Sequence, residues 1–202
     1  MLYFIAMSKG RLEAFSDGVI AILITIMVLE LHVPHGDDFA ALKPLAPVFF
    51  SYVLSFVYLG IYWNNHHHML QLTSRINGGV LWANLHLLFW LSIVPFVTGW
   101  MGENHFSNLP TAIYGGVLLM SAISYTILQE TIIRAQGPTS RLRAAIGGDR
   151  KGKLSLVFYI AAIPLAFTMP GISQALFVLV ALIWLVPDRR IEHQLHDPPT
   201  RT

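Results

Sequence analysis

The chain has 202 residues, of which 54% are apolar and only 12% are charged, and its formal net charge is +2. An ordinary soluble domain carries about a quarter charged residues. A soluble fold of this size could not keep so few charges on its surface, so the composition indicates an integral membrane protein. The absence of cysteine excludes disulfides, Cys-ligated zinc and thiol chemistry.

Long apolar segments predict the number of membrane crossings, because a transmembrane helix needs about 20 mostly apolar residues. The last two segments are short, and Pro170-Gly171 predicts a tight turn between them. We therefore predict an all-α integral membrane protein with six transmembrane helices in residues 1–187 and a polar cytoplasmic tail in residues 188–202. The expected spans are Leu12 to Val33, Leu45 to Leu70, Gly78 to Met101, Leu109 to Ile133, Leu154 to Met169 and Ile172 to Val186.

The basic residues fall almost entirely on one side of this predicted topology. Only Lys43 lies in a connection on the other side. By the positive-inside rule, both termini are expected in the cytoplasm. The positive charge is thus a topology signal, and no nucleic-acid partner is expected. The twelve residues on the cytoplasmic side are Lys9, Arg11, Arg75, Arg134, Arg141, Arg143, Arg150, Lys151, Lys153, Arg189, Arg190 and Arg201.

The first predicted span begins with a polar motif, R-x-x-x-F-S-D, formed by Arg11, Phe15, Ser16 and Asp17. A charge carried into hydrocarbon is costly, so Asp17 must face protein or water and marks a candidate functional site. The motif and the G-V-I-A-I-L-I-T that follows resemble the first helix of the transmembrane protein 175 family of cation channels. This resemblance implies a potassium-permeable channel of the single-repeat prokaryotic type, in a bacterial cytoplasmic membrane. It also implies a homotetramer that is surrounded by membrane lipid and whose pore passes K⁺. Whether other monovalent cations or protons also pass is left open.

Helical geometry places an aliphatic stripe along the first span. At about 100° per residue, Ile22, Ile26 and Leu29 lie within about 40° of Phe15, and Thr25 lies about 80° away. From the residues alone, this stripe is typical of ordinary packing or lipid contact. The resemblance instead implies that the first helix lines the pore, with a constriction of aliphatic rings at Ile22, Ile26 and Leu29 and the Thr25 hydroxyl beside it.

Asp17 projects about 160° from Phe15, which leaves two interpretations. It either lies in the permeation path or belongs to a latch that holds the first helix to its neighbours, and its position opposite the stripe favours the latch. Its expected partner is His66 or His67, which share one helical face with Trp63 near the end of the second span. Glu30, at the outer mouth, either concentrates cations or is a solvated interfacial carboxylate.

The remaining polar groups suggest no cofactor. Consecutive side chains on a helix point about 100° apart, so His66, His67 and His68 cannot all bind one ion, and no metal is expected. Asn84 and His86 are polar groups inside the third span, where packing between helices is the default interpretation.

Two alternatives to a channel stay open at this stage. One is a proton-coupled secondary transporter that uses Asp17 and the membrane histidines. The lack of a visible inverted repeat counts against it. The other is a membrane-embedded hydrolase, for which Asp17, Glu13 and the histidines are the plausible groups, although we expect no enzyme.

Overall fold

The computed structural model describes residues 8–186, and within this range all regular structure is helical, as predicted. The expected polar tail 188–202 lies outside the described residues. Three 3-10 turns, Met27–Glu30, Lys43–Leu45 and Gly137–Thr139, join or extend the helices. The helices are α1 (Lys9–Ile26), α2 (Phe39–Leu42), α3 (Ala46–Gln71), α4 (Gly78–Glu103), α5 (Asn108–Gln136), α6 (Arg141–Ile146), α7 (Arg150–Thr168) and α8 (Pro170–Leu185).

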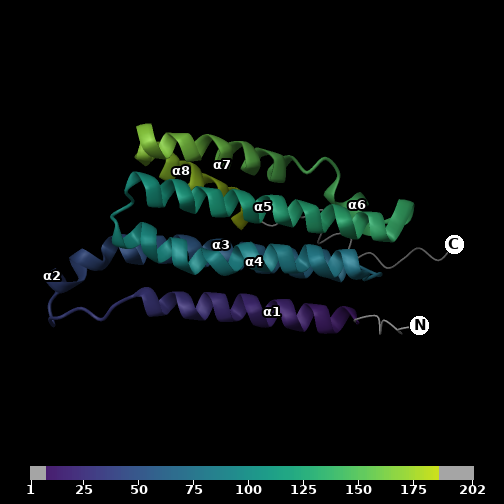
Figure 1. Ribbon diagram of the computed structural model, residues 1–202, viewed down its shortest axis with the longest axis horizontal. Coiled ribbons are helices and arrows are strands. Elements are labelled where there is room, and N and C mark those ends of the chain that lie inside the picture. Colours follow the sequence, from purple (N-terminus) through teal and green to yellow (C-terminus); the bar gives the residue numbers. More distant parts are fainter. Residues whose placement is uncertain (1–7, 187–202) are drawn as a thin grey trace.

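The long helices run side by side along the long axis of the molecule (Figure 1). α1 lies at one edge and packs on α3 and α4, while α5 packs on α4 and carries α7 and α8. α2 lies at one end of the bundle, and α6 lies at the other end, where α1 also begins. The long helices thus form one bundle that leaves one side of α1 without a neighbour in the subunit.

Within residues 8–186, five segments are long and apolar enough to cross a bilayer. α8 has 16 residues and is shorter than the others. The predicted spans agree with the helices to within a few residues at most ends. The five segments are Lys9–Glu30, Phe39–Gln71, Gly78–Glu103, Asn108–Gln136 and Arg150–Thr168.

The predicted outer end of the first span, at Val33, is wrong. The α-helix ends at Ile26, a 3-10 turn runs to Glu30, and Leu31 is already extended, with φ −84° and ψ 95°. Val33 precedes Pro34, and a proline ring disfavours helical backbone in the residue before it. The proline accounts for the non-helical backbone at Val33, whereas the α-helix has already ended at Ile26.

Polar residues fix several helix starts by accepting a hydrogen bond from a backbone N–H in the first turn. One of these caps belongs to α6, a short helix that the sequence analysis did not predict. α6 has only six residues, too few to show a periodic pattern, and it is held by the burial of Leu142 and Ala145. The capping pairs are Asp38 with Ala41, Asn77 with Val80, Ser140 with Arg143 and Asp149 with Gly152.

α3 and α4 approach closely around Gly102. A Cβ at Gly102 would lie 2.7 Å from the Val48 Cα and would also collide with the Ser51 hydroxyl. Because the first of these neighbours is backbone, no side-chain movement relieves the collision. By contrast, a Cβ at Gly116, also inside a helix, would meet nothing within 4 Å.

We predict that Gly102→Ala lowers the thermal midpoint of the detergent-purified protein, because overpacking of this kind costs about 1–3 kcal/mol. Gly116→Ala is the matched control. It should leave the midpoint unchanged or raise it slightly, since alanine is the better helix former. Equal midpoints for the two variants would show that α3 and α4 do not approach closely at Gly102.

Candidate functional site

α1 has two chemically different faces. Its buried face packs on α3 and α4 and comprises Leu12, Ser16, Ile20 and Leu23, followed by Met27 in the 3-10 turn. The opposite face carries the predicted stripe and is open in the subunit. The exposed fraction is 47% for Phe15, 59% for Ile22, 40% for Ile26 and 75% for Leu29, and Thr25 is also exposed.

A buried polar network joins α1 to both of its neighbours. The Asn84 side chain on α4 donates from Nδ2 to the Ser16 Oγ, 2.9 Å away, and the Ser16 hydroxyl donates to the Leu12 carbonyl. The Asn84 Oδ1 lies 2.7 Å from the His66 Nε2 on α3. An amide oxygen can only accept, so His66 Nε2 is the donor. Asn84 thereby bridges α1 and α3 from α4, and all three side chains are buried.

Asp17, one residue later, contacts α3 at the edge of this network. The Trp63 Nε1 donates to Asp17 Oδ1 at 3.1 Å. The partner expected from the sequence was His66 or His67, but His66 bonds Asn84, and His67 contacts Gln71 and stacks on the Trp63 ring. The expected face of α3 does meet Asp17, but through Trp63, one helical turn before His67.

The first two residues of the motif do not take part in these contacts. Arg11 and Phe15 are exposed, on the side of α1 that carries the stripe. Lys9, and not Arg11, connects the start of α1 to α3. Its Nζ donates to the Gln71 carbonyl at the end of α3, 2.9 Å away, and lies 3.7 Å from the Glu13 carboxylate. The structure thus divides the motif, with Ser16 and Asp17 facing α3 and α4 and with Arg11 and Phe15 facing outward.

Glu30 is half-buried and lies against α4. A Cβ at Gly99 would lie 2.8 Å from Glu30 Oε2, so the carboxylate occupies the space that this glycine leaves open. Gly99 therefore permits a contact that a larger residue would displace. The position of Glu30 at the outer mouth stays a prediction; the structure places Glu30 in the last turn of the span, with its side chain toward α4.

The histidines do not converge on a metal site within residues 8–186, where no group of three or more His, Cys, Asp or Glu side chains could hold an ion. His86 is half-buried and accepts a hydrogen bond from the Trp90 Nε1 on the same helix. Asn84, its neighbour on the third span, is the residue whose role was underestimated from the sequence. The sequence did contain a signal for this role, namely a single amide side chain within an otherwise apolar stretch of the helix.

The fold and this site define a multi-pass membrane protein whose first helix is anchored on one face and open on the other. Residues 11–95 match the family described as the endosomal/lysosomal potassium channel TMEM175. A potassium channel of Chryseobacterium sp. is 56% identical over 191 residues, which cover 95% of this chain and 100% of that protein. A potassium channel of Streptomyces collinus is 31% identical over 187 residues, with 87% and 91% coverage.

A solved structure agrees with these relatives. The crystal structure described as a lysosomal potassium-selective channel TMEM175 homolog from Chamaesiphon minutus matches with a TM-score of 0.78 and 27% identity, over 89% of this chain and 97% of that one. The chain belongs to the TMEM175 family, and the family predicted from the sequence is confirmed. This is a family of channels and not a class of enzymes.

The Asn84 bridge should couple Ser16 energetically to α4. We predict that Asn84→Leu, which keeps the side chain's bulk but leaves Ser16 Oγ and His66 Nε2 without this partner, lowers stability by about 1–2 kcal/mol in detergent. Asn104→Leu, at the exposed end of the same helix, should cost much less. The measurement is the thermal midpoint of each purified variant.

A double-mutant cycle isolates the bridge from general packing. Ser16→Ala should destabilise the wild-type chain and have little further effect once Asn84 is leucine. Additive losses in the double variant would mean that the Ser16–Asn84 hydrogen bond does not stabilise the protein.

Proposed function

We propose that the chain forms a homotetrameric, potassium-permeable cation channel in the bacterial cytoplasmic membrane, with both termini in the cytoplasm. The observation that carries this proposal is the exposed apolar stripe of α1, which lies opposite a face fixed by buried hydrogen bonds. The names of the relatives, potassium channels in each case described above, support it. One six-helix bundle cannot enclose a central pore, so four copies would place their α1 helices around a common axis.

In this arrangement, four copies each of Ile22, Ile26 and Leu29 would form stacked hydrophobic rings. Such rings gate by dewetting, and an ion passes only where it keeps part of its hydration shell. Potassium loses water at lower cost than the smaller sodium ion, so a ring without ligands favours K⁺ modestly. Thr25 donates its hydroxyl hydrogen to the Ile22 carbonyl, which leaves the hydroxyl oxygen as an acceptor for a passing cation. No resident cofactor is required.

Six membrane crossings are part of the proposal, and α8 is the sixth. Its 16 residues extend about 24 Å at 1.5 Å per residue, against a hydrocarbon core of about 30 Å. The direct turn at Met169 between α7 and α8 suits a hairpin whose tip barely leaves the membrane. The basic connection that contains α6 lies at the end of the bundle where α1 begins (Figure 1), which supports a common cytoplasmic side.

The proton-coupled transporter has no comparable support. A proton relay needs titratable groups in series across the membrane. Asp17, His66 and His67 instead gather where the start of α1 meets the end of α3, and His86 bonds a tryptophan on its own helix. The relatives are named as channels.

Purified protein in a planar bilayer under a potassium gradient tests the channel proposal. We expect unitary current steps that reverse near the K⁺ equilibrium potential and shift modestly when Na⁺ replaces K⁺ on one side. Uptake without unitary steps, at the rate of a transporter, would contradict a channel.

The pore assignment is tested by two isoleucines on the same helix. Ile22→Ala should widen the constriction, raise the single-channel amplitude and reduce discrimination between K⁺ and Na⁺. Ile24, which is partly buried and packs against the core, is the matched control, and Ile24→Ala should leave permeation nearly unchanged. Bi-ionic reversal potentials and single-channel amplitudes measure both effects. Equal effects at the two positions, or none at Ile22, would place the pore elsewhere.

A further inference from the structure

A hollow lined by two basic side chains lies between α5, α6 and the start of α7. Arg143 on α6 and Lys153 on α7 line it, together with Glu130 on α5 and with Asp149. Its volume of about 160 Å³ gives room for about ten waters at roughly 10–15 Å³ each on this measure. A phosphate group is small enough for this space, and two cations are in place to meet it.

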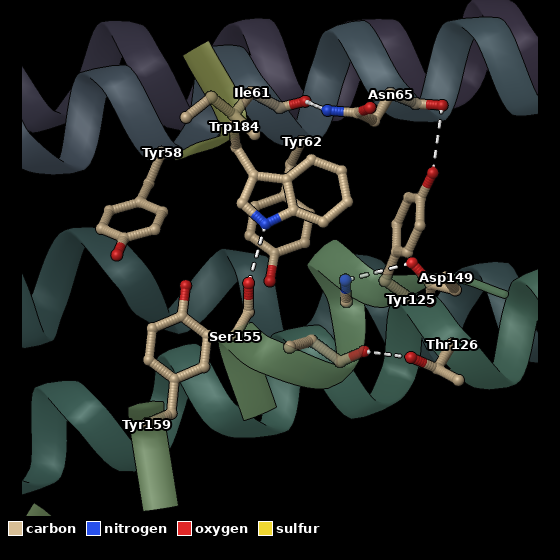
Figure 2. Close-up of a pocket in the computed structure, with 12 residues that line it drawn as sticks. Tyr58, Ile61, Tyr62, Asn65, Tyr125, Thr126, Asp149, Ser155, Tyr159 and Trp184 are labelled. Atoms are coloured by element: carbon tan, nitrogen blue, oxygen red, sulfur yellow. Dashed lines mark hydrogen bonds between the residues drawn. The ribbon is translucent and has the colours of Figure 1, made fainter. Parts of the chain in front are cut away.

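The two carboxylates of the hollow already have partners in the protein. Asp149 Oδ1 accepts a hydrogen bond from the Gly152 N–H, 3.0 Å away, and Figure 2 shows this bond from the side of a smaller aromatic cavity. Glu130 Oε2 lies 3.8 Å from Arg143 Nη2, which is too long for a hydrogen bond. The Lys153 ammonium has no hydrogen bond or ion pair with any residue from 8 to 186. Both basic side chains therefore have donors available for an anion.

The connection around the hollow has a large excess of positive charge. From Arg134 to Lys153 it contains six basic residues and one acidic residue, Asp149. Clusters of basic residues next to the cytoplasmic end of a transmembrane helix attract anionic lipids, because the surface of that leaflet is negative. The charge of this segment thus complements an anionic headgroup.

A tryptophan marks the depth of the hollow in the membrane. The Lys151 Nζ lies 5.9 Å from the centroid of the Trp184 ring, and the Trp184 Nε1 donates to Ser155 Oγ at 2.8 Å. Tryptophan concentrates at the boundary between membrane and water. The start of α7, with Lys153, therefore lies at the level of the lipid headgroups.

An apolar stripe runs along α7 from the hollow into the membrane. Lys153, Val157, Ile160 and Phe167 recur at helical spacing on one exposed face. The exposed fraction is 60% for Val157, 60% for Ile160 and 52% for Phe167. At 1.5 Å per residue, the stripe extends about 21 Å from Lys153 to Phe167, against about 15 Å for half of the hydrocarbon core. A cationic hollow that continues into such a stripe matches an amphipathic molecule better than a soluble phosphate.

We propose that the hollow binds the headgroup of an anionic glycerophospholipid whose acyl chains lie along the exposed stripe of α7. The phosphodiester oxygens accept hydrogen bonds from the Arg143 guanidinium, a planar donor that suits phosphate, and from the Lys153 ammonium. The inference uses the cytoplasmic side proposed above for α6, but it does not use the pore. A chain without channel activity would therefore still bind the lipid.

Native mass spectrometry of the detergent-purified full chain measures lipid binding directly. The probes are dioleoylphosphatidylglycerol, which is anionic, and dioleoylphosphatidylcholine, which has the same acyl chains and no net charge. We expect one phosphatidylglycerol per subunit, bound about thirtyfold more tightly than phosphatidylcholine, because each of two basic residues near an anionic lipid contributes about fivefold. Equal affinities for the two lipids would overturn the proposal, and this comparison needs no variant.

A soluble competitor distinguishes a lipid from a free phosphate ester. Glycerophosphoglycerol has the headgroup of phosphatidylglycerol but no acyl chains, so it should displace the lipid poorly. Displacement at equal concentration would assign the hollow to a soluble phosphate ester and would contradict a lipid site.

Paired charge removals locate the site. Arg143→Gln with Lys153→Gln should lower the affinity for phosphatidylglycerol about thirtyfold, with little change in the thermal midpoint, since the exposed Arg143–Glu130 pair contributes little. Arg75→Gln with Arg134→Gln is the matched control. It removes two exposed charges on the same predicted side but outside the hollow, and it should leave the affinity nearly unchanged. Equal losses in the two double variants would indicate diffuse attraction and overturn the proposed site.

Discussion

The hydrogen bonds of one buried amide determine how the first helix sits in the bundle. Asn84 on α4 reaches Ser16 on α1 and His66 on α3. In an apolar environment without water, a polar group left unpaired costs free energy, and hydrogen bonds of this kind between membrane helices contribute about 1–2 kcal/mol. Rotation of α1 about its axis would break the contact with Ser16. The bridge therefore selects one rotation, and this rotation leaves Ile22 and Leu29 on the open side.

Contacts along the whole length of α1 favour the same rotation. Lys9 bonds the end of α3, Asp17 accepts a hydrogen bond from Trp63, and Glu30 fills the space beside Gly99 on α4. Exposure alone does not distinguish a pore-lining face from a lipid-facing one, because other helices also expose large apolar side chains such as Phe50 and Phe96. α1 is distinguished by two features. Its open face lies opposite the buried hydrogen bond between Ser16 and Asn84, and both of its ends contact neighbouring helices.

Hydrophobic patterning was sufficient to predict the long helices, because polar or glycine-containing connections separate each long apolar run from the next. It failed where a local backbone effect or a short element decided the outcome, as at the early end of α1 and at α6. The site was predictable to the level of a helix face. Periodicity placed Trp63, His66 and His67 together, but it could not tell which of them reaches Asp17. The Ser16–Asn84 contact spans 68 residues, and no pattern within one helix encodes it.

The most direct test of the account is a cysteine-accessibility scan along α1 with current recording, since the chain has no cysteine of its own. Single cysteines at Ile22 and Leu29 would be compared with cysteines at Leu23 and Met27, on the face buried against α3 and α4. A water-soluble cationic thiol reagent is predicted to change the current at the first two positions and not at the last two. Modification confined to Leu23 and Met27, or equal at all four positions, would contradict a pore lined by the open face of α1.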